Sequence, residues 1–529
     1  MSVSGPGPSS AADLRRWPLT VLDRLTQRND GSDGERLHRL ESHFRRGLCV
    51  YSDYSGISGE HEIFWQMTHA LQQRSMYASM DSVQLTRVCD FGSVQQNVLM
   101  QLSALEPEGF CVMQDINDRL PPVARQVLDA AMPPRDADVV TAAAAYKDMA
   151  SYLMDNRQWV YTDAFSQCLA HSRRCRLFRR IDDSPAQELD ADSQPSPSKR
   201  PRVEGPRKLR INFAGTTCKG WSMAGKQLQF SDVSERPHAV WITERFRRAE
   251  VAEEDLFFSE CTPKYPVQVK ISEPLQPTHT VISVVVGPDS LGWPVRRKRV
   301  FCCGLSNATV AWLGPPEDQV QADFYKFFQA TLQLTGDVFL LASPEEVYAE
   351  QTRLAKLRGH FLPETPAAVQ KHQVYSPGQL VRLQAYDKMR LCKFGRDHPF
   401  FADLEQNAGY GSSTAGSILP SCLTHGTLHS WTADRLVTAK ELFFAHGFNV
   451  FPDEAAWPVQ CKVAEILEGL PSGHQKMLLG NGWHIPTLSS WVFYVLCHTV
   501  RINRHCSVRP ERTLLRSGGS QLLEDSSQG

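Results

Sequence analysis

The chain has 529 residues, more than one hydrophobic core usually supports, so we expect two or more domains. Hydrophobic residues make up 42% of the chain and charged residues 22%, which is typical of a globular protein. The net charge is −1, which excludes a general attraction to nucleic acid or to a membrane surface. Any affinity for phosphate must come from local clusters of basic residues.

Cysteine usage and apolar segments give two further expectations. The 14 cysteines include no C-x-x-C pair and the N-terminus lacks the apolar core of a signal peptide, so we expect reduced, intracellular thiols and no metal site. The most apolar late segment, Leu488–Val500, has 13 residues, fewer than the roughly 20 that span a bilayer. We therefore expect a buried helix there and no membrane partner.

Strand ends that carry polar residues dominate the first third of the chain. Residues 1–45 form an N-terminal extension, a Ser/Gly/Pro tail that becomes helical and charged. "GLCVYSDYSGISGEHEIFWQM", which begins at Gly47, then predicts an apolar strand, a glycine-bearing turn and an amphipathic helix. Two more apolar runs end in Asp90 and Asp115. This alternation predicts an α/β fold with a mostly parallel sheet and a ligand site at one sheet edge.

A polar insertion divides this first domain. Residues 46–181 form its first part, with residues 123–180 predicted to be helical. Residues 182–209 have five prolines and few large apolar side chains, which predicts a disordered linker. The basic stretch Lys199–Arg210 has six Lys/Arg against one Glu and resembles a nuclear localisation signal. A solvated linker with incidental charge is the alternative interpretation.

The second half of the chain predicts a return to the sheet, a smaller domain and a late return to the first. Strand-like runs fill residues 210–311, and weaker periodicity in residues 312–430 predicts a small second domain. In it, Lys371–His398 interleaves basic and aromatic residues, as phosphate-tracking surfaces do, although an ordinary solvated surface has the same composition. Residues 431–507 are well patterned again and precede a tail at 508–529.

One cysteine lies in a suggestive context. Cys218, in "FAGTTCKGWSMAG", follows a predicted strand in a turn-rich stretch, although an isolated cysteine is more often a buried, inert residue. Three downstream stretches add polar groups: "FFSECTPKYP" with Glu260, "GWPVRRKRVFCCG" with Arg297 and Arg299, and "GNGWHIP" with Asn481. An acid, two cations and a thiol at successive strand ends are the groups that nucleophilic catalysis needs.

The order of these motifs resembles the cytosine-5 DNA methyltransferase family. The matching stretches are, in chain order, "SDYSGISG", "TTCKGWSMAGK", "SECTP", "PVRRKRVF", "RLVTAKELFFAHGF" and "GNGWHIP". The resemblance covers about residues 47–118, 210–305 and 430–500. It implies a Rossmann-like S-adenosylmethionine-dependent methyltransferase domain with a mostly parallel sheet, and a smaller target-recognition domain.

The resemblance also implies a role for each matching residue. Cys218 is the nucleophile that adds to carbon 6 of cytosine, Glu260 is the acid at ring nitrogen 3, and Arg299 is the cation at the carbonyl oxygen. Arg297, expected on the same strand face, positions the loop or a phosphate. The residues implied for the cofactor S-adenosylmethionine are Tyr54, Ser55, Gly56, Gly59, Asp90, Asp115 and Asn481. From the residues alone, each aspartate is equally a helix N-cap or turn residue, and Gly-Asn-Gly an αL turn.

Several positions depart from the family pattern. Thr216 and Thr217 replace the two prolines before the nucleophile, Lys219 follows it, and Ser58 replaces a glycine of the cofactor loop. The charged and nucleophilic groups remain, which favours an active, divergent enzyme. We therefore expect a nuclear DNA cytosine-5 methyltransferase. The alternatives are an RNA cytosine-5 methyltransferase and a catalytically impaired regulatory paralogue that binds nucleic acid or a partner methyltransferase.

Overall fold

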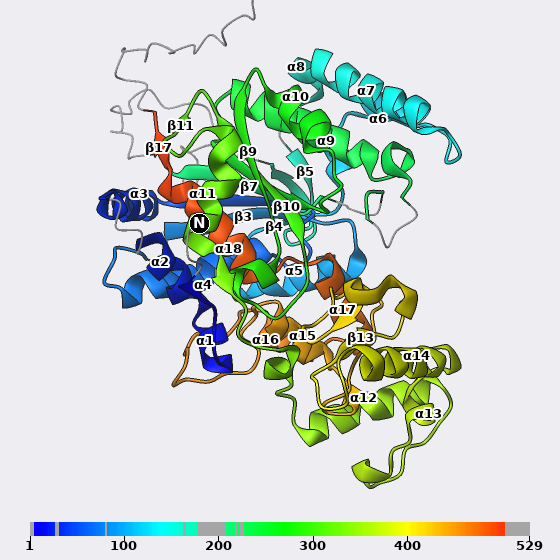
Figure 1. The fold of residues 1–529 in the computed structure, drawn as a ribbon. Helices are drawn as coiled ribbons and strands as arrows, with labels where there is room; N and C mark the ends of the chain where they lie inside the picture. Colours follow the sequence, from blue (N-terminus) through cyan, green and yellow to red (C-terminus); the bar gives the residue numbers. More distant parts are fainter. Residues whose placement is uncertain are drawn as a thin grey trace, which may run out of the picture.

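Alternating apolar strands and amphipathic helices build a nine-stranded sheet with helices on both faces (Figure 1). The structure is a computed structural model that describes residues 5–26, 31–79, 82–161, 165–177, 207–216, 220–222 and 227–502. Most of the linker predicted at 182–209 and the whole tail at 508–529 lie outside the described residues.

The central sheet has the strand order β6-β5-β4-β3-β2-β7-β8-β10-β9. The strands from β4 to β8 pair in parallel, and β10 lies antiparallel between β8 and β9. The parallel strands follow the 3-2-1-4-5 order of doubly wound folds, which confirms the predicted α/β class. The bounds are β2 (Leu48–Asp53), β3 (Val83–Cys89), β4 (Cys111–Met113), β5 (Phe165–Cys168), β6 (Arg173–Arg176), β7 (Leu209–Ala214), β8 (Leu256–Cys261), β9 (His279–Val286) and β10 (Arg299–Ser306).

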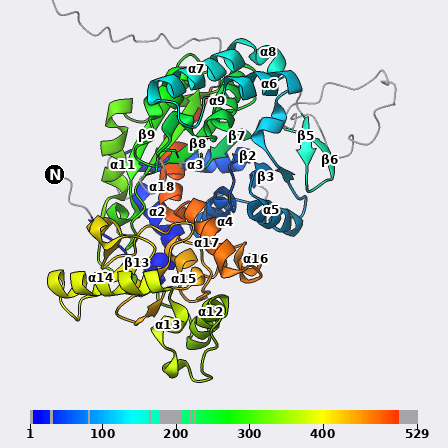
Figure 2. The ribbon, with the colours of Figure 1, turned by 90° about the vertical axis from the view of Figure 1, so that its right-hand side faces the viewer.

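The two faces of the sheet bury two hydrophobic cores. Along β2 the side chains alternate, so that Leu48 and Val50 belong to one core and Cys49 and Tyr51 to the other. Figure 2 shows the sheet edge-on between its helical layers. The first core is covered by α2 (Trp17–Thr26), α3 (Asp33–Arg46), α4 (Gly59–Gln73), α5 (Ser93–Leu105), α11 (Val320–Phe328) and α18 (Ile485–Cys497). The second is covered by α6 (Pro122–Ala131), α7 (Val139–Asp155), α8 (Arg157–Val160), α9 (Glu235–Glu250) and α10 (Glu273–Leu275).

One predicted helical segment is a hairpin. The helices expected after residue 123 are present as α6, α7 and α8, but Phe165–Arg176 forms strands β5 and β6. This part of the prediction was wrong because the segment has no apolar repeat of 3.6 residues, and its conformation comes from long-range pairing of Cys168 with Met113 on β4. The hairpin covers an edge of the sheet that would otherwise expose β4.

A second, smaller core follows α11. Its sheet has the order β14-β13-β15-β16, and its aromatic residues include Tyr375 and Tyr386, both buried. These tyrosines belong to the Lys371–His398 stretch, so at least part of its aromatic content serves packing. The elements are α12 (Pro344–Leu357), α13 (Lys371–Val374), α14 (Pro377–Lys393), β13 (Phe401–Asp403), β14 (Ala415–Gly416), β15 (Leu428–Ser430) and β16 (Arg435–Leu436).

The chain then returns to the main core. Every residue of α18 is buried, which confirms the helix expected around Leu488–Val500. None of the described helices combines the length and the apolar character that crossing a bilayer requires. The remaining elements are α1 (Ala11–Arg15), α15 (Ala439–Ala445), α16 (Ala464–Glu468), α17 (Ser472–Asn481) and the strand pairs β1 (Gly5–Pro6) with β12 (Ala330–Thr331), and β11 (Val310–Trp312) with β17 (Thr499–Arg501).

Candidate functional site

The carboxyl ends of five strands carry the predicted site residues. The loop after β2 holds Tyr54 to Gly59, β3 ends just before Asp90, and β4 ends two residues before Asp115. The loop after β7 leads toward Cys218, and Glu260 lies near the end of β8. β2 and β7 are parallel neighbours at the point where the strand order reverses, so the loops that follow them diverge. The position between these two loops is the usual ligand site of this fold.

The loop after β2 has an unusual backbone. Tyr54, Gly56 and Ser58 all have positive φ angles, of 55°, 56° and 58°. Ser58 stands where the resembled family has glycine, and its left-handed conformation costs about 1 kcal/mol or more. Such strain persists where the surroundings hold it, and it is concentrated at functional sites. The loop is held by Ser55, whose N–H donates to the carbonyl oxygen of Cys89 at 3.0 Å.

Asp90 anchors the same loop from the neighbouring strand. Its Oδ2 accepts the N–H of Gly56 at 2.8 Å, and its Oδ1 accepts the N–H of Gly92 at 2.9 Å. Burial raises the pKa of Asp90. Each carboxylate oxygen therefore accepts one backbone N–H, which is the turn role that the sequence also allowed, and each keeps a second lone pair that can accept a ligand hydroxyl. A Cβ on Gly56 would meet nothing within 4 Å, so space is open beside this backbone.

Two further residues face the same region with different roles. The buried hydroxyl of Tyr54 has no hydrogen-bond partner in the part of the chain that the structure describes. Burial raises the pKa of Tyr54 well above its usual range, so this phenol stays neutral and remains a donor. Asp115 caps the 3₁₀ turn Ile116–Arg119, where its Oδ1 accepts the N–H of Asn117 at 2.9 Å. The N-cap role of Asp115 is thus also present, and its other oxygen is left for a ligand donor.

A buried carboxyl group lies at the start of α4. Glu60 is fully buried; its Oε1 accepts the hydroxyl of Ser58 at 2.7 Å, and its Oε2 has no hydrogen-bond partner among the described residues. Burial raises the pKa of Glu60 to about 7. The folded state therefore holds this proton well above the pH at which an unfolded glutamate loses it.

We expect Glu60→Gln to remove a pH dependence of stability. A folded pKa of about 7 against an ordinary value of 4.5 means that stability is fully present below about pH 4.5 and is lost as pH rises through 7, by about 3 kcal/mol. The variant should match the wild type at pH 5 and be more stable at pH 8. Chemical denaturation at both pH values measures this. Glu35→Gln, at a side chain that is 75% exposed, is the control and should change neither curve. Equal stability of Glu60→Gln and the wild type at pH 8 would contradict the prediction.

Glu260 and Arg299 form an ion pair at the end of β8. Arg299 Nε lies 2.9 Å from Glu260 Oε1, and their side chains are 15% and 9% exposed. Strands β8 and β10 pair so that Phe301 lies opposite Glu260, which brings the first residue of β10 beside the acid. The structure thus brings together the acid and the cation that the resemblance assigned to ring nitrogen 3 and to the adjacent carbonyl oxygen of one pyrimidine. Arg299 leaves Glu260 Oε2 to a ligand.

Cys218 itself lies outside the described residues, but both flanks of its loop are described. Thr216 Oγ1 donates to the carbonyl oxygen of Glu260 at 3.4 Å. On the other side, Thr262 Oγ1 donates to the carbonyl oxygen of Trp221 at 3.3 Å. Thr216 precedes Cys218 by two residues and Trp221 follows it by three, so both ends of a short loop are bound to the strand that carries Glu260.

Trp221 is fixed by a buried ion pair. Its Nε1 donates to Glu235 Oε1 at 3.2 Å, and Glu235 Oε2 accepts Lys270 Nζ at 2.5 Å. Lys270 is 1% exposed and lies 5.6 Å from the Trp221 ring centroid. The Trp221 end of the loop is therefore bound to the buried Glu235–Lys270 ion pair, which the sequence did not indicate.

Arg297 and the late Gly-Asn motif are bonded to each other. Arg297 is 4% exposed and donates to the carbonyl oxygens of Cys422, Gly480 and Gly482. It precedes β10, which begins at Arg299, so the expectation of a shared strand face was wrong. Arg297 instead holds the late motif against the sheet. Asn481, the last residue of α17, is exposed, and residues 480–482 have no positive φ, so the αL-turn alternative was also wrong.

Trp483 joins three of the motifs. A Cβ on Gly215 would lie 3.1 Å from Trp483 Nε1, and one on Gly59 would lie 3.5 Å from the Trp483 ring. The approach at Gly215 is tight enough that a Cβ there would push on the indole, whereas the distance at Gly59 is an ordinary van der Waals contact. Trp483, which belongs to the late "GNGWHIP" motif, therefore lies against both the loop after β2 and the loop that leads to Cys218. This contact requires segments from both ends of the chain to fold together.

A buried ion network lies directly beneath the loop after β2. Asp53, the last residue of β2, is 0% exposed. Its Oδ1 accepts from Arg87 at 3.0 Å and from Arg119, and its Oδ2 accepts from Asn212 at 2.9 Å and lies 3.6 Å from Arg245 Nη1. These arginines hold the pKa of Asp53 well below its usual range, although burial alone would raise it. The network joins the end of β2 to β3, β7, α9 and the turn after β4 below the site.

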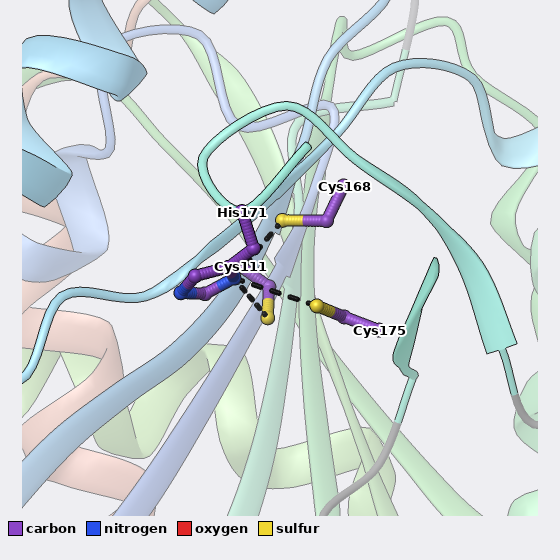
Figure 3. Close-up of side chains that lie close together, drawn as sticks. All are labelled: Cys111, Cys168, His171 and Cys175. Atoms are coloured by element: carbon purple, nitrogen blue, oxygen red, sulfur yellow. Dashed lines mark hydrogen bonds between the residues drawn. The ribbon is translucent and has the colours of Figure 1, made fainter. Parts of the chain in front are cut away.

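Sequence reasoning missed one other group of reactive side chains. Cys111 on β4 and Cys168, His171 and Cys175 in the β5–β6 hairpin bring their ligand atoms within 4.8 Å of one another (Figure 3). The available signal was C-x₂-H-x₃-C at residues 168–175, which a search for C-x-x-C does not detect. Its fourth member is distant in sequence and reaches the others only through the pairing of β4 with β5.

Comparisons with known proteins return structures only. No protein-family model matches the chain, and no curated protein does. The similar solved structures include a mutant of Spodoptera frugiperda DNMT2, with a TM-score of 0.37, 11% identity, and coverage of 85% of this chain and 99% of that one. S. pombe Dnmt2 has a TM-score of 0.38, 10% identity, and coverage of 85% and 98%. Entamoeba histolytica methyltransferase EhMeth has a TM-score of 0.36, 10% identity, and coverage of 85% and 98%.

Proposed function

We propose that this chain is an S-adenosylmethionine-dependent methyltransferase that acts on carbon 5 of cytosine in DNA. The observation that carries the proposal is the meeting of the motifs at one sheet edge. Glu260 and Arg299 pair there, Thr216 and Trp221 bind the end of β8, which carries Glu260, and Trp483 contacts both glycine-bearing loops. Five of the six motifs that resemble the family in sequence order contribute residues to these contacts, which supports the proposal.

The chemistry follows from the residue types. Carbon 5 of cytosine is a poor nucleophile, so the Cys218 thiolate first adds to carbon 6 and electron density moves to carbon 5. Glu260 holds a proton at ring nitrogen 3, and Arg299 orients Glu260 and stabilises charge at the carbonyl oxygen. Carbon 5 then gains the methyl group. A base removes the carbon 5 proton, the carbon–sulfur bond breaks by elimination, and the thiolate is regenerated.

The residues after β2 and β3 fit the cofactor. This region offers open space beside Gly56, a buried Tyr54 phenol that has no hydrogen-bond partner among the described residues, and the carboxylate of Asp90. These features suit a ligand with ribose hydroxyls and an aromatic base. Asp115 keeps one carboxylate oxygen for an amine donor. When bound, S-adenosylmethionine supplies the electrophilic methyl group. Tyr54, Asp90 and Asp115 would bind and orient it.

DNA is the proposed polymer, and the nucleus is the proposed location. The basic stretch Lys199–Arg210 supports nuclear import, and a nuclear cytosine-5 methyltransferase meets DNA as its main substrate. Because carbon 6 is hidden inside a duplex, the enzyme must flip the base outward at a cost of a few kcal/mol. Methylation of RNA by the same residues is the other outcome of the test below.

Trapping with 5-fluorocytosine tests the proposal. Fluorine at carbon 5 cannot leave as a proton does, so elimination stops and the thiolate remains bound to the base. The full chain is incubated with S-adenosylmethionine and with DNA or RNA that contains 5-fluorocytosine. We expect a denaturation-resistant adduct with DNA, and its loss in Cys218→Ser.

The control is Cys392→Ser, which removes an exposed thiol from α14 and should trap as well as the wild type. An adduct with RNA alone would replace DNA by RNA in the proposal. An adduct that still forms in Cys218→Ser would exclude Cys218 as the nucleophile. The absence of an adduct on both polymers, with measurable binding of the cofactor, would overturn catalysis and favour a regulatory protein.

A further inference from the structure

We propose that Cys111, Cys168, His171 and Cys175 form a structural zinc site at the edge of the sheet. The site is separate from the proposed methyl transfer and is expected whether or not the chain is an active enzyme. Figure 3 shows the four side chains converging on a common centre, with His171 facing the three sulfur atoms. They come from β4, from the end of β5, from the hairpin turn and from β6.

The distances match those of a tetrahedral zinc site. His171 Nδ1 lies 3.6 Å from Cys111 Sγ, 3.4 Å from Cys168 Sγ and 3.4 Å from Cys175 Sγ. Zinc bonds of about 2.3 Å to sulfur and about 2.0–2.1 Å to nitrogen, at tetrahedral angles, place sulfur and nitrogen about 3.5 Å apart. All four ligand atoms also lie within 4.8 Å of one another.

The ligand set selects zinc over other metals and over disulfides. Three thiolates and one imidazole in a tetrahedron are a usual structural zinc set, with no position left open for catalysis. The three cysteines are all free in the structure, and an odd number of thiols cannot be satisfied by disulfides alone. Convergence of all three on one histidine nitrogen is explained by a shared cation.

The hairpin has few other means of attachment. Its strands have four residues each, and its pairing with β4 consists of Met113 with Cys168, next to one hydrogen bond from the Leu169 N–H to the Val112 carbonyl oxygen at 2.8 Å. An isolated two-stranded hairpin is only marginally stable in water. A zinc ion bound by both hairpin strands and by β4 would supply the missing stability.

The site also lies just before a predicted cofactor residue. Cys111 begins β4, and Asp115 follows four residues later, two residues after the strand ends. Fixing β4 against the hairpin therefore fixes the start of the turn that Asp115 caps. The proposed role is structural: the ion orders the sheet edge and does not touch the proposed substrate.

Metal analysis of the purified full chain tests the site. The chain is expressed in medium with zinc, passed over a desalting column and analysed by inductively coupled plasma mass spectrometry. We expect about one zinc per chain. His171→Ala, at an exposed side chain that the core does not need, should lower zinc at least fivefold, and His171→Cys should restore it by supplying a fourth thiolate. Cys392→Ser is the control and should keep full zinc.

Cobalt substitution supplies an independent readout. Replacing zinc by Co²⁺ should give absorption bands of tetrahedral cobalt with thiolate charge transfer, which should be lost in Cys175→Ser. Wild type with less than 0.1 zinc per chain and no cobalt bands would overturn the proposal, whether its thiols are free or paired in a disulfide. Full zinc in both His171→Ala and Cys175→Ser would overturn the ligand assignment.

Discussion

Glu260→Gln should lower methyl transfer by about 10²- to 10⁴-fold, the usual effect of removing a general acid. Glutamine keeps the shape of the side chain and one oxygen for Arg299 Nε, which lies 2.9 Å from Glu260 in the wild type. The amide cannot give a proton to ring nitrogen 3, so the addition of the thiolate loses its charge stabilisation. Single-turnover transfer of labelled methyl groups to DNA measures the loss.

Cofactor binding should be unchanged in this variant, because Glu260 lies on β8 and the predicted cofactor residues follow β2, β3 and β4. Calorimetric titration with S-adenosylmethionine therefore separates loss of chemistry from loss of the site. Glu273→Gln, at an exposed side chain on α10, is the matched control and should transfer at the wild-type rate. A Glu260→Gln enzyme within threefold of the wild type would remove Glu260 from the mechanism.

Substitution of Arg299, the ion-pair partner of Glu260, gives a second test of the same site. Arg299→Lys keeps the charge but loses the planar guanidinium that holds Glu260, so an intermediate loss of rate is expected. If Arg299 acted only on stability, this variant would transfer methyl groups normally once folded. The Glu260 and Arg299 substitutions therefore test separately the acid and the group that orients it.

The sequence predicted the strand ends well because their signals are local. Asp90 and Asp115 each follow an apolar run, and the run itself identifies the strand that places them at the sheet edge. Contacts that depend on several distant strands had no such signal. The position of Arg297 at the carbonyl oxygens of the late motif depends on how residues 480–482 return to the sheet, which spacing within "PVRRKRVF" does not indicate.

The same reason explains the two groups that the sequence did not reveal. Asp53 has the same local context as any strand-end aspartate, yet it is surrounded by arginines from β3, from the turn after β4 and from α9. Cys111 is an unremarkable cysteine until β5 pairs beside it. Both groups arise from strand order, which is set by the packing of the whole sheet.

Asp53→Asn should destabilise the protein by about 3–5 kcal/mol, as expected when one partner of a buried ion network is removed. Asn has the same size as Asp, so no cavity is made. Arg87, Arg119 and Arg245 would remain buried around a neutral amide, and their mutual repulsion would no longer be offset. Denaturation with guanidinium, together with hydrogen exchange of peptides that cover β2 and residues 115–119, measures the effect. Exchange there should accelerate by about 100-fold or more.

A surface pair is the matched control. Asp129→Asn removes the partner of Arg236 at a carboxylate that is 59% exposed, and it should cost less than about 1 kcal/mol. Because the folded pKa of Asp53 is depressed, its stabilisation is fully present above about pH 4 and is lost as pH falls further. The difference between wild type and Asp53→Asn should therefore shrink below pH 4. A difference under 1 kcal/mol at pH 7 would contradict the prediction.

A double substitution distinguishes charge from shape. If uncompensated positive charge causes the loss, adding Arg87→Met to Asp53→Asn should recover part of the stability, because one buried cation is removed together with its partner. If the loss came from packing, the second substitution would add to the first. Because Asp53 immediately precedes Tyr54 and Arg119 lies on the turn capped by Asp115, the network that sets this stability also fixes two of the strand ends proposed to bind the cofactor.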